Sequence, residues 1–210
     1  LLDEPLANLD AKLRHDTRAE LKRLQRDLNM TMVYATPDQL EALTMGDNIT
    51  IINNGKFIQK GSPNNLYDKP NNTYVAKMIG SPTINFINAK LAQDNNQNII
   101  ELPFGKLNLN NPLSSKNDFL NTEISFGIRP HDITLANDNS KDNFDANVFL
   151  KEPLGDVTIL DIAIKNNKLK MILPEEEAIK YDVGNNIKIT IDASKAYLFT
   201  SDTGVNINKN

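Results

Sequence analysis

The 210-residue sequence contains no cysteine and no tryptophan. Without cysteine the chain can have neither disulfides nor thiolate metal ligands, which fits a reducing compartment. Aromatic residues make up only 6% of the sequence and the formal net charge is −4, so the basic, stacking surface of a nucleic-acid-binding protein is absent and no nucleic-acid partner is expected. No apolar run reaches the length of about 18 residues that a transmembrane helix needs. No charged-then-apolar leader is visible at the start, so we expect no signal peptide in this sequence.

A further absence concerns nucleotides. The pattern GxxxxGK[ST], whose backbone amides cradle phosphate groups, does not occur anywhere in the sequence. The chain starts at Leu1, without an initiator methionine and within an expected strand, so we expect a piece of a longer protein. With 40% apolar residues it is long enough for one or two hydrophobic cores.

The first residues form the most informative stretch of the chain. Leu1 and Leu2 precede two carboxylates, a pattern typical of a buried parallel strand that ends at a ligand crevice and presents Asp3 at its carboxyl end. Pro5 favours a turn there, so Asp3 and Glu4 would have different surroundings and different roles. An aspartate can hold magnesium and a glutamate can orient and deprotonate a water molecule, whereas the alternative is a strand end with two solvated acids.

The residues up to Gly80 predict an α/β arrangement. Leucines at helical spacing over 9–28 predict an amphipathic helix packed on a sheet, and residues 30–36 predict a neighbouring strand. Thr36 and Gln39 flank Pro37 in a capping-box pattern, which predicts a helix that buries Leu40 and Leu43. Asn-Gly between residues 48–53 and 56–60 predicts a β-hairpin, and two short helices follow at 63–69 and 73–79.

After Gly80 the pattern changes to short strands without helices. Nine strand-like runs, from residues 84–92 to 196–199, are separated by Asn, Asp, Gly and Lys, which predicts a small β-barrel or sandwich. We expect its core to include Ile124, Phe126, Ile128, Val148, Ile159, Ile162 and Phe199. Arg129 and His131 could mark an anion pocket, but the Arg-Pro pair favours the alternative, a brace for a loop.

Taken together, these motifs resemble the ATPase subunits of ATP-binding-cassette (ABC) importers of the maltose-importer type. LLDEP followed by LANLD is similar to the Walker B strand and D-loop of that family, and DQLEALTMGD, NNGKFIQKGSPNNLYDKP and YVAKMIGSPTINF match it in order and spacing. Residues 127–131, KEPLGD and AYLFTSDTG resemble the regulatory domain of these subunits. The resemblance therefore covers essentially the whole chain.

The resemblance implies roles for particular residues. Asp3 would support magnesium bound with ATP, and Glu4 would be the catalytic residue that positions the attacking water. Pro37 stands where the family has a switch histidine that contacts the γ-phosphate, and proline has no side-chain donor. The D-loop, at the interface between two ATPase subunits, would be Ala7, Asn8, Leu9 and Asp10, with Ala7 in place of the usual serine.

The fold implied by the resemblance is the α/β carboxyl-terminal part of a P-loop ABC ATPase domain over residues 1–80, followed by an all-β OB-like (TOBE) barrel over 81–210. The full-length protein would bind ATP and magnesium and couple hydrolysis to solute uptake, most simply of a sugar. The piece itself would bind neither and would be inactive. Partners would be a second ATPase subunit, in a homo- or heterodimer, the membrane permease and, indirectly, a solute-binding protein, at the cytoplasmic face of the membrane. Two alternatives stay open: a catalytically degenerate regulatory subunit of a heterodimer, and an independent OB-like ligand-binding module.

Overall fold

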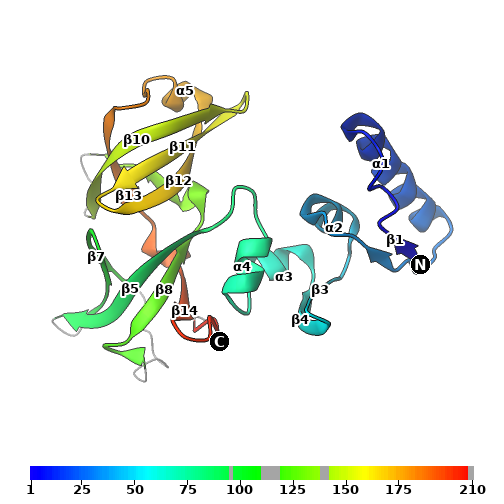
Figure 1. Ribbon diagram of the computed structural model, residues 1–210, viewed down its shortest axis with the longest axis horizontal. Coiled ribbons are helices and arrows are strands. Elements are labelled where there is room, and N and C mark those ends of the chain that lie inside the picture. The colour runs from blue at the N-terminus through cyan, green and yellow to red at the C-terminus, as the bar shows by residue number, and fades with distance from the viewer. Residues whose placement is uncertain (95–96, 110–118, 138–141, 208–210) are drawn as a thin grey trace. The chain divides into compact units, whose positions relative to one another are not determined.

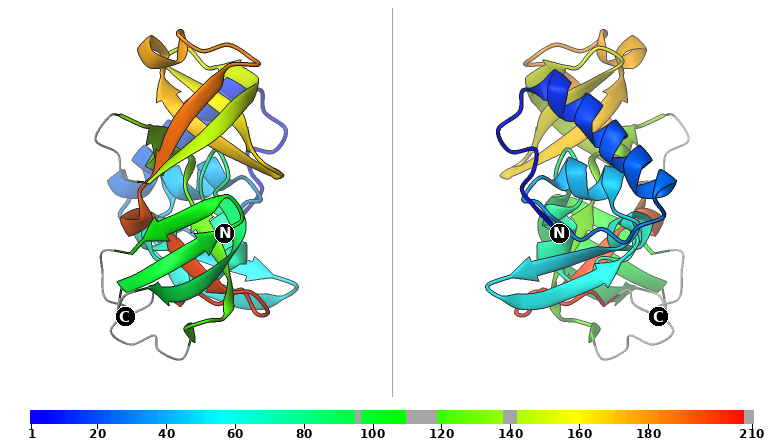
Figure 2. Two further views of the ribbon diagram at one scale, coloured as in Figure 1. Left: turned by 90° about the vertical axis from the view of Figure 1, so that its left-hand side faces the viewer. Right: turned by 90° about the vertical axis from the view of Figure 1, so that its right-hand side faces the viewer.

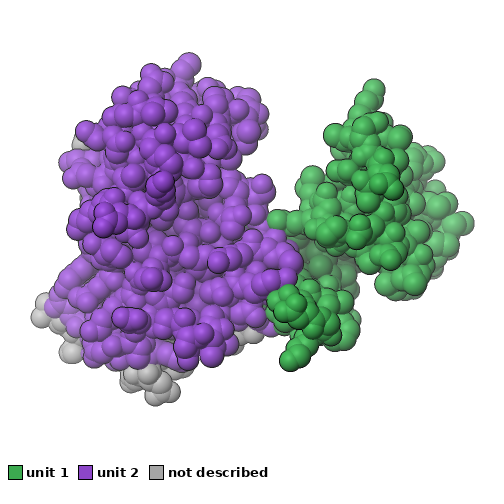
Figure 3. Space-filling model, in the orientation of Figure 1, with its two compact units in different colours: residues 1–70 green, residues 71–210 purple. Residues whose placement is uncertain are grey.

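The computed structural model describes residues 1–94, 97–109, 119–137 and 142–207. The chain forms two compact units, Leu1–Pro70 and Asn71–Asn210 (Figure 3). The sequence placed the domain boundary after Gly80, whereas helix α4 (Thr73–Met78) here belongs to the second unit. The reason is packing: Ala76 is fully buried and forms a cluster with Ile84 and Phe199.

The first unit contains three helices and four short strands, all within its fully described residues. In chain order these are β1 (Leu2–Asp3), α1 (Ala11–Asp27), β2 (Tyr34–Ala35), α2 (Gln39–Met45), β3 (Ile49–Asn53), β4 (Lys56–Gly61) and α3 (Pro63–Asp68). The predicted hairpin is confirmed as β3 and β4 (Figure 2), because Asn54 and Gly55 both adopt the positive φ angles, 48° and 72°, that a tight two-residue turn needs. The short helix predicted at 63–69 is found as α3, and Ser62 caps it by accepting a hydrogen bond from the amide of Asn65.

Helix α1 is confirmed, but the packing expected for it is not found. None of its residues is buried, and Leu13 and Leu24 are 48% and 46% exposed. The physical reason is that β1 and β2, with two residues each, form a sheet too small to cover an apolar helix face. Across residues 1–70, all of which the structure describes, the buried apolar side chains are Leu6, Ile49, Ile51, Leu66 and Pro70.

The second unit consists mainly of two five-stranded antiparallel sheets (Figure 1). The β5 sheet has the order β14-β8-β5-β6-β7, and the β10 sheet has the order β12-β11-β10-β13-β9. Their bounds are β5 (Asn85–Asp94), β6 (Gln97–Leu102), β7 (Gly105–Asn108), β8 (Glu123–Ile128), β9 (Ile133–Leu135), β10 (Asn143–Pro153), β11 (Val157–Ile164), β12 (Asn167–Pro174), β13 (Asn186–Ile191) and β14 (Tyr197–Thr200). The unit also contains the helical turn α5 (Glu175–Ala178) and the 3₁₀ turns η2 (Pro130–Asp132) and η3 (Ala193–Lys195).

Both sheets contribute to one hydrophobic core, which fits a barrel of OB type. Residues of the β5 sheet such as Phe126 pack in the same cluster as Val148 and Ile162 of the β10 sheet. All seven core residues expected from the sequence are buried, and Phe199 lies in the smaller cluster with Ala76. Among the described residues, no helix combines the length and apolar character needed to cross a membrane.

Candidate functional site

The candidate site is set by the parallel pairing of β1 with β2. Asp3 lies opposite Ala35, and the amide of Glu4 donates a 2.9 Å hydrogen bond to the carbonyl oxygen of Ala35. Because parallel strands end at the same edge of a sheet, Thr36 and Pro37 leave the sheet beside Asp3 and Glu4. The predicted parallel strand with Asp3 at its carboxyl end is confirmed, although neither of its two residues is buried.

The chain turns sharply at Glu4. This residue has φ +43°, a left-handed conformation uncommon for a residue with a side chain, and the amide of Ala7 donates 3.2 Å to its carbonyl oxygen. Such conformations cost roughly 1–3 kcal/mol and are found preferentially at functional sites. The turn predicted around Pro5 is therefore present, and both the Asp3 and Glu4 side chains are exposed to solvent.

The segment Ala7–Asp10 joins this turn to α1. Asp10 is the N-cap of α1, since its Oδ1 accepts a 2.9 Å hydrogen bond from the amide of Leu13. Arg14 in the first turns of the helix donates from Nη2 to the carbonyl oxygen of Leu9 over 2.9 Å. Hydrogen bonds with α1 thus fix Leu9 and Asp10, while Ala7 and Asn8 are exposed.

The segment after β2 departs from the predicted capping box. Helix α2 begins at Gln39, and its N-cap is Asp38, whose Oδ1 accepts from the amide of Glu41 over 3.1 Å. The Thr36 hydroxyl instead accepts from the amide of Asp38 over 3.0 Å. Thr36 is therefore not the cap and Pro37 lies outside the helix, exposed. The expected burial of Leu40 is also wrong, because that side chain is 56% exposed.

Glu41 is a site residue that the sequence reasoning missed. Its side chain is buried, and its Oε2 accepts hydrogen bonds from the hydroxyls of Thr36 over 2.8 Å and Tyr34 over 3.0 Å. Arg14 Nε lies 3.9 Å from its Oε1. Burial and, after it, the hydrogen bond to Glu41 raise the pKa of the Tyr34 phenol to about 12. The spacing Asp38-x-x-Glu41 is itself a helix-start pattern that would have singled Glu41 out.

Arg14, Tyr34, Thr36 and Glu41, which we call the Glu41 cluster, connect the two segments of the site. Arg14 donates to the carbonyl oxygens of Leu6, over 3.4 Å, and Leu9 on one side and faces Glu41 on the other. Glu41 in turn accepts a hydrogen bond from the hydroxyl of Thr36, the residue before Pro37. Side-chain contacts through Arg14 and Glu41 therefore link the segment after β1 to the segment after β2.

Asp3 and Glu4 present exposed carboxylates at this sheet edge. Among the described residues, no group of three or more His, Asp or Glu side chains is arranged to hold a metal ion. Magnesium is commonly held by one or two carboxylates together with the phosphates of a substrate. An exposed carboxylate at a strand end fits that arrangement, in which most ligands come from elsewhere.

Comparison with known proteins gives a consistent result. No family model matches the chain. It is 37% identical over 209 residues to the trehalose/maltose import ATP-binding protein MalK of Thermococcus litoralis, covering 97% of this chain and 56% of that protein. It is 38% identical over 207 residues to the maltose/maltodextrin import ATP-binding protein MalK of Mannheimia succiniciproducens, covering 96% of this chain and 55% of that protein.

A third relative has a different sugar in its name. The chain is 34% identical over 210 residues to the xylose/arabinose import ATP-binding protein XacK of Haloferax volcanii, covering 97% of this chain and 53% of that protein. The chain spans about half the length of the curated relatives it matches. Over nearly all of its own length, this chain is a homologue of the ATP-binding subunits of sugar importers, and the resemblance indicated by its motifs is confirmed.

Proposed function

We propose that this chain is the carboxyl-terminal part of the ATP-binding subunit of an ABC importer for a sugar or related solute. The observation that carries the proposal is the parallel pairing of β1 and β2, which brings Asp3 and Glu4 to the same sheet edge as Pro37. The similarity to sugar-import proteins through both compact units supports it. That same similarity does not favour an independent ligand-binding module.

In this proposal Asp3 and Glu4 have separate tasks. Asp3 holds magnesium, which when bound neutralises charge on the phosphates of ATP. Glu4, at the left-handed turn after β1, accepts a proton from the water molecule that attacks the γ-phosphate. The phosphate-cradling amides come from the part of the full-length subunit that this chain does not include.

The apolar surface of the first unit supports a larger ATPase domain. Leu13, Leu24, Val33 and Leu40 are 46–61% exposed, and Leu13 and Leu24 lie on the helix whose apolar side the small β1–β2 sheet leaves uncovered. The relatives are about twice as long as this chain. We propose that the remaining part of the subunit covers this surface.

The proposed partners follow from the same assignment to an ABC importer. The D-loop Ala7, Asn8, Leu9 and Asp10 contacts a second ATP-binding subunit, and its exposed Ala7 and Asn8 are available for that contact. The pair of subunits binds the membrane permease at its cytoplasmic face, and the second compact unit is an OB-like regulatory domain.

Pro37 and Ala7 favour a second candidate, a subunit that binds ATP and closes against an active partner but hydrolyses poorly. Pro37 has no side-chain donor for the γ-phosphate, and Ala7 has no hydroxyl to contact the other subunit. Architecture, partners and localisation are the same in both candidates.

The test is ATP hydrolysis and sugar uptake by the full-length subunit assembled with its permease. We expect Glu4→Gln to lower hydrolysis by roughly 100- to 10,000-fold while ATP binding persists. Glu20→Gln is the matched control, because Glu20 is an exposed residue of α1 that forms a surface ion pair with Arg23. Hydrolysis unaffected by Glu4→Gln would overturn the assignment of Glu4.

A further inference from the structure

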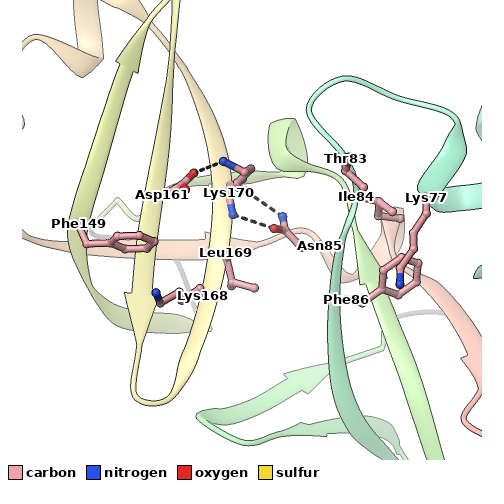
Figure 4. Close-up of a pocket in the computed structure, with 10 residues that line it drawn as sticks. All are labelled: Lys77, Thr83, Ile84, Asn85, Phe86, Phe149, Asp161, Lys168, Leu169 and Lys170. Carbon is pink, nitrogen blue, oxygen red and sulfur yellow. Dashed lines mark hydrogen bonds and ion pairs between the residues drawn. The ribbon is translucent and has the colours of Figure 1, made fainter. Parts of the chain in front are cut away.

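A hollow of about 360 Å³ lies in the second unit, between α4, the start of β5 and the β12 edge of the β10 sheet (Figure 4). Its volume falls in the range of small-molecule sites, roughly 300–1,000 Å³. Its walls are largely apolar, with Ile84, Phe86, Phe149 and Leu169 among the lining side chains. None of the functional roles proposed above involves this hollow.

Asn85 fixes the position of the two sheets at the hollow. Its Nδ2 donates to the carbonyl oxygen of Lys170 over 2.8 Å, and the amide of Lys170 donates to its Oδ1 over 2.7 Å. Figure 4 shows this pair of hydrogen bonds joining β5 to β12. Because the side chain of Asn85 is buried and both of its polar atoms are used, the hollow is formed before any ligand arrives.

The lysines around the hollow leave an excess of positive charge. Lys170 is neutralised by Asp161, whose Oδ1 lies 2.6 Å from its Nζ. Neither Lys77 nor Lys168 has a carboxylate within ion-pair distance in the part of the chain that the structure describes. The apolar hollow is therefore lined by two lysines whose charge no carboxylate of the described residues compensates.

Each of these two lysines lies over an aromatic ring. Lys77 Nζ is 5.5 Å from the centroid of the Phe86 ring, and Lys168 Nζ is 4.8 Å from the centroid of the Phe149 ring. The aromatic faces attract the ammonium groups and hold them at the walls of the hollow. The arrangement therefore combines positive charge with flat apolar surface.

We propose that this hollow binds a small organic anion with a flat apolar body, such as an aromatic carboxylate. Lys77 and Lys168 supply the charge that attracts the anionic group, and Phe86 and Phe149 supply the surface against which the body packs. The proposal is independent of ATP hydrolysis, because it uses only residues of the second unit. It gives the OB-like unit a ligand site of its own.

The test uses the 210-residue chain and two probes, 2-naphthoate and its neutral counterpart 2-naphthamide. Titration followed by ¹H–¹⁵N NMR is expected to show saturable shifts of the amides of Asn85 and Leu169 with naphthoate. Naphthamide is expected to bind at least about fivefold more weakly, since it lacks the charge. The double variant Lys77→Gln/Lys168→Gln should weaken naphthoate binding about tenfold and leave naphthamide binding within about twofold.

The matched control is Lys90→Gln/Lys188→Gln, which removes the same charge from two exposed strand positions that do not line the hollow. It should leave naphthoate binding within about twofold. The spectra also report whether each variant is folded. Equal binding of the two probes, shifts confined to other parts of the chain, or equal weakening by the control pair would overturn the proposal.

Discussion

The guanidinium of Arg129 donates a 2.7 Å hydrogen bond from Nη1 to the carbonyl oxygen of Ile79, just after α4. Arg129 is almost fully buried, and its guanidinium carbon lies 5.5 Å from the centroid of the Tyr197 ring. Of the two interpretations open at the sequence level, this geometry favours a brace over an anion pocket. The side chain of the neighbouring His131 is exposed, and its Nε2 lies 3.5 Å from Oδ2 of Asp132.

Replacement of this brace should destabilise the second unit. Arg129→Met keeps the apolar stem but leaves the Ile79 carbonyl without its charged donor, which costs about 2–3 kcal/mol of unfolding free energy. Urea unfolding followed by circular dichroism measures this cost. Lys90→Met, at an exposed position of β5, is the control and should change stability by less than about 0.5 kcal/mol. Equal stability of the two variants would contradict the role of Arg129.

The boundary of the second unit can be tested by truncation. A chain of residues 71–210 keeps Ala76 in the cluster with Phe199, and keeps the hydrogen bond from the Thr73 amide to the Gly204 carbonyl, 2.9 Å long. A chain of residues 81–210, the domain predicted from the sequence, loses both. We expect both chains to be mainly β, with 81–210 less stable by about 3 kcal/mol. Identical unfolding midpoints would show that α4 does not belong to the unit.

The Glu41 cluster predicts a specific titration. Burial is the first cause of the raised Tyr34 pKa and Glu41 the second, so Glu41→Gln should lower that pKa from about 12 while leaving it above its ordinary value. Ultraviolet difference titration against Tyr34→Phe isolates this phenol. Glu20→Gln, on the exposed side of α1, should leave it unchanged. A Tyr34 pKa that does not respond to Glu41→Gln would mean that the hydrogen bond between them is not made.

Local patterns predicted most of the elements. The Asn54-Gly55 turn was predictable because its left-handed angles are a property of those two residues, and all nine expected strands of the second unit are found. Strand β7 was missed because it is short and polar, and is formed by pairing with β6 at a sheet edge. Helix α5 was missed because a single turn has no periodicity.

The candidate site was predicted less completely, for a physical reason. Asp3, Glu4 and Pro37 each lie in a recognisable sequence motif at the end of a predicted strand. Parallel pairing of the two short strands then brings these residues to the same sheet edge. The buried carboxylate of Glu41 is approached by Arg14, which lies 27 positions earlier in the chain, and no local pattern contains that contact. Likewise, the packing of α4 on Phe199 joins residues more than a hundred positions apart.

The isolated 210-residue chain is expected not to bind ATP appreciably. It has no glycine-rich loop to cradle the phosphates, and one carboxylate at Asp3 cannot replace those amides. Isothermal titration calorimetry with magnesium and ATP measures this directly, with the full-length subunit as the positive control. Micromolar affinity of the 210-residue chain would contradict the prediction.

The substitution at Pro37 should limit hydrolysis in the full-length subunit, even though Glu4 is present. Hydrolysis needs donors set around the charge that develops on the γ-phosphate, and loss of one such donor costs roughly 100- to 1,000-fold in comparable sites. Pro37 is exposed and precedes the Asp38 cap, and Thr36 keeps its hydrogen bonds to Asp38 and Glu41 without it. Pro37→His should therefore leave the local fold intact.

The decisive comparison is the steady-state ATPase rate of the assembled transporter with Pro37, with Pro37→His and with Glu4→Gln. We expect a slow rate with Pro37 and a gain of at least about tenfold with Pro37→His, because the imidazole restores a donor to the γ-phosphate. Pro37→Ala is the matched control, since it removes the proline ring without adding a donor, and should bring no gain. If Pro37→His brings no gain while Glu4→Gln abolishes a high starting rate, the subunit hydrolyses ATP without the histidine and the degenerate-site hypothesis fails.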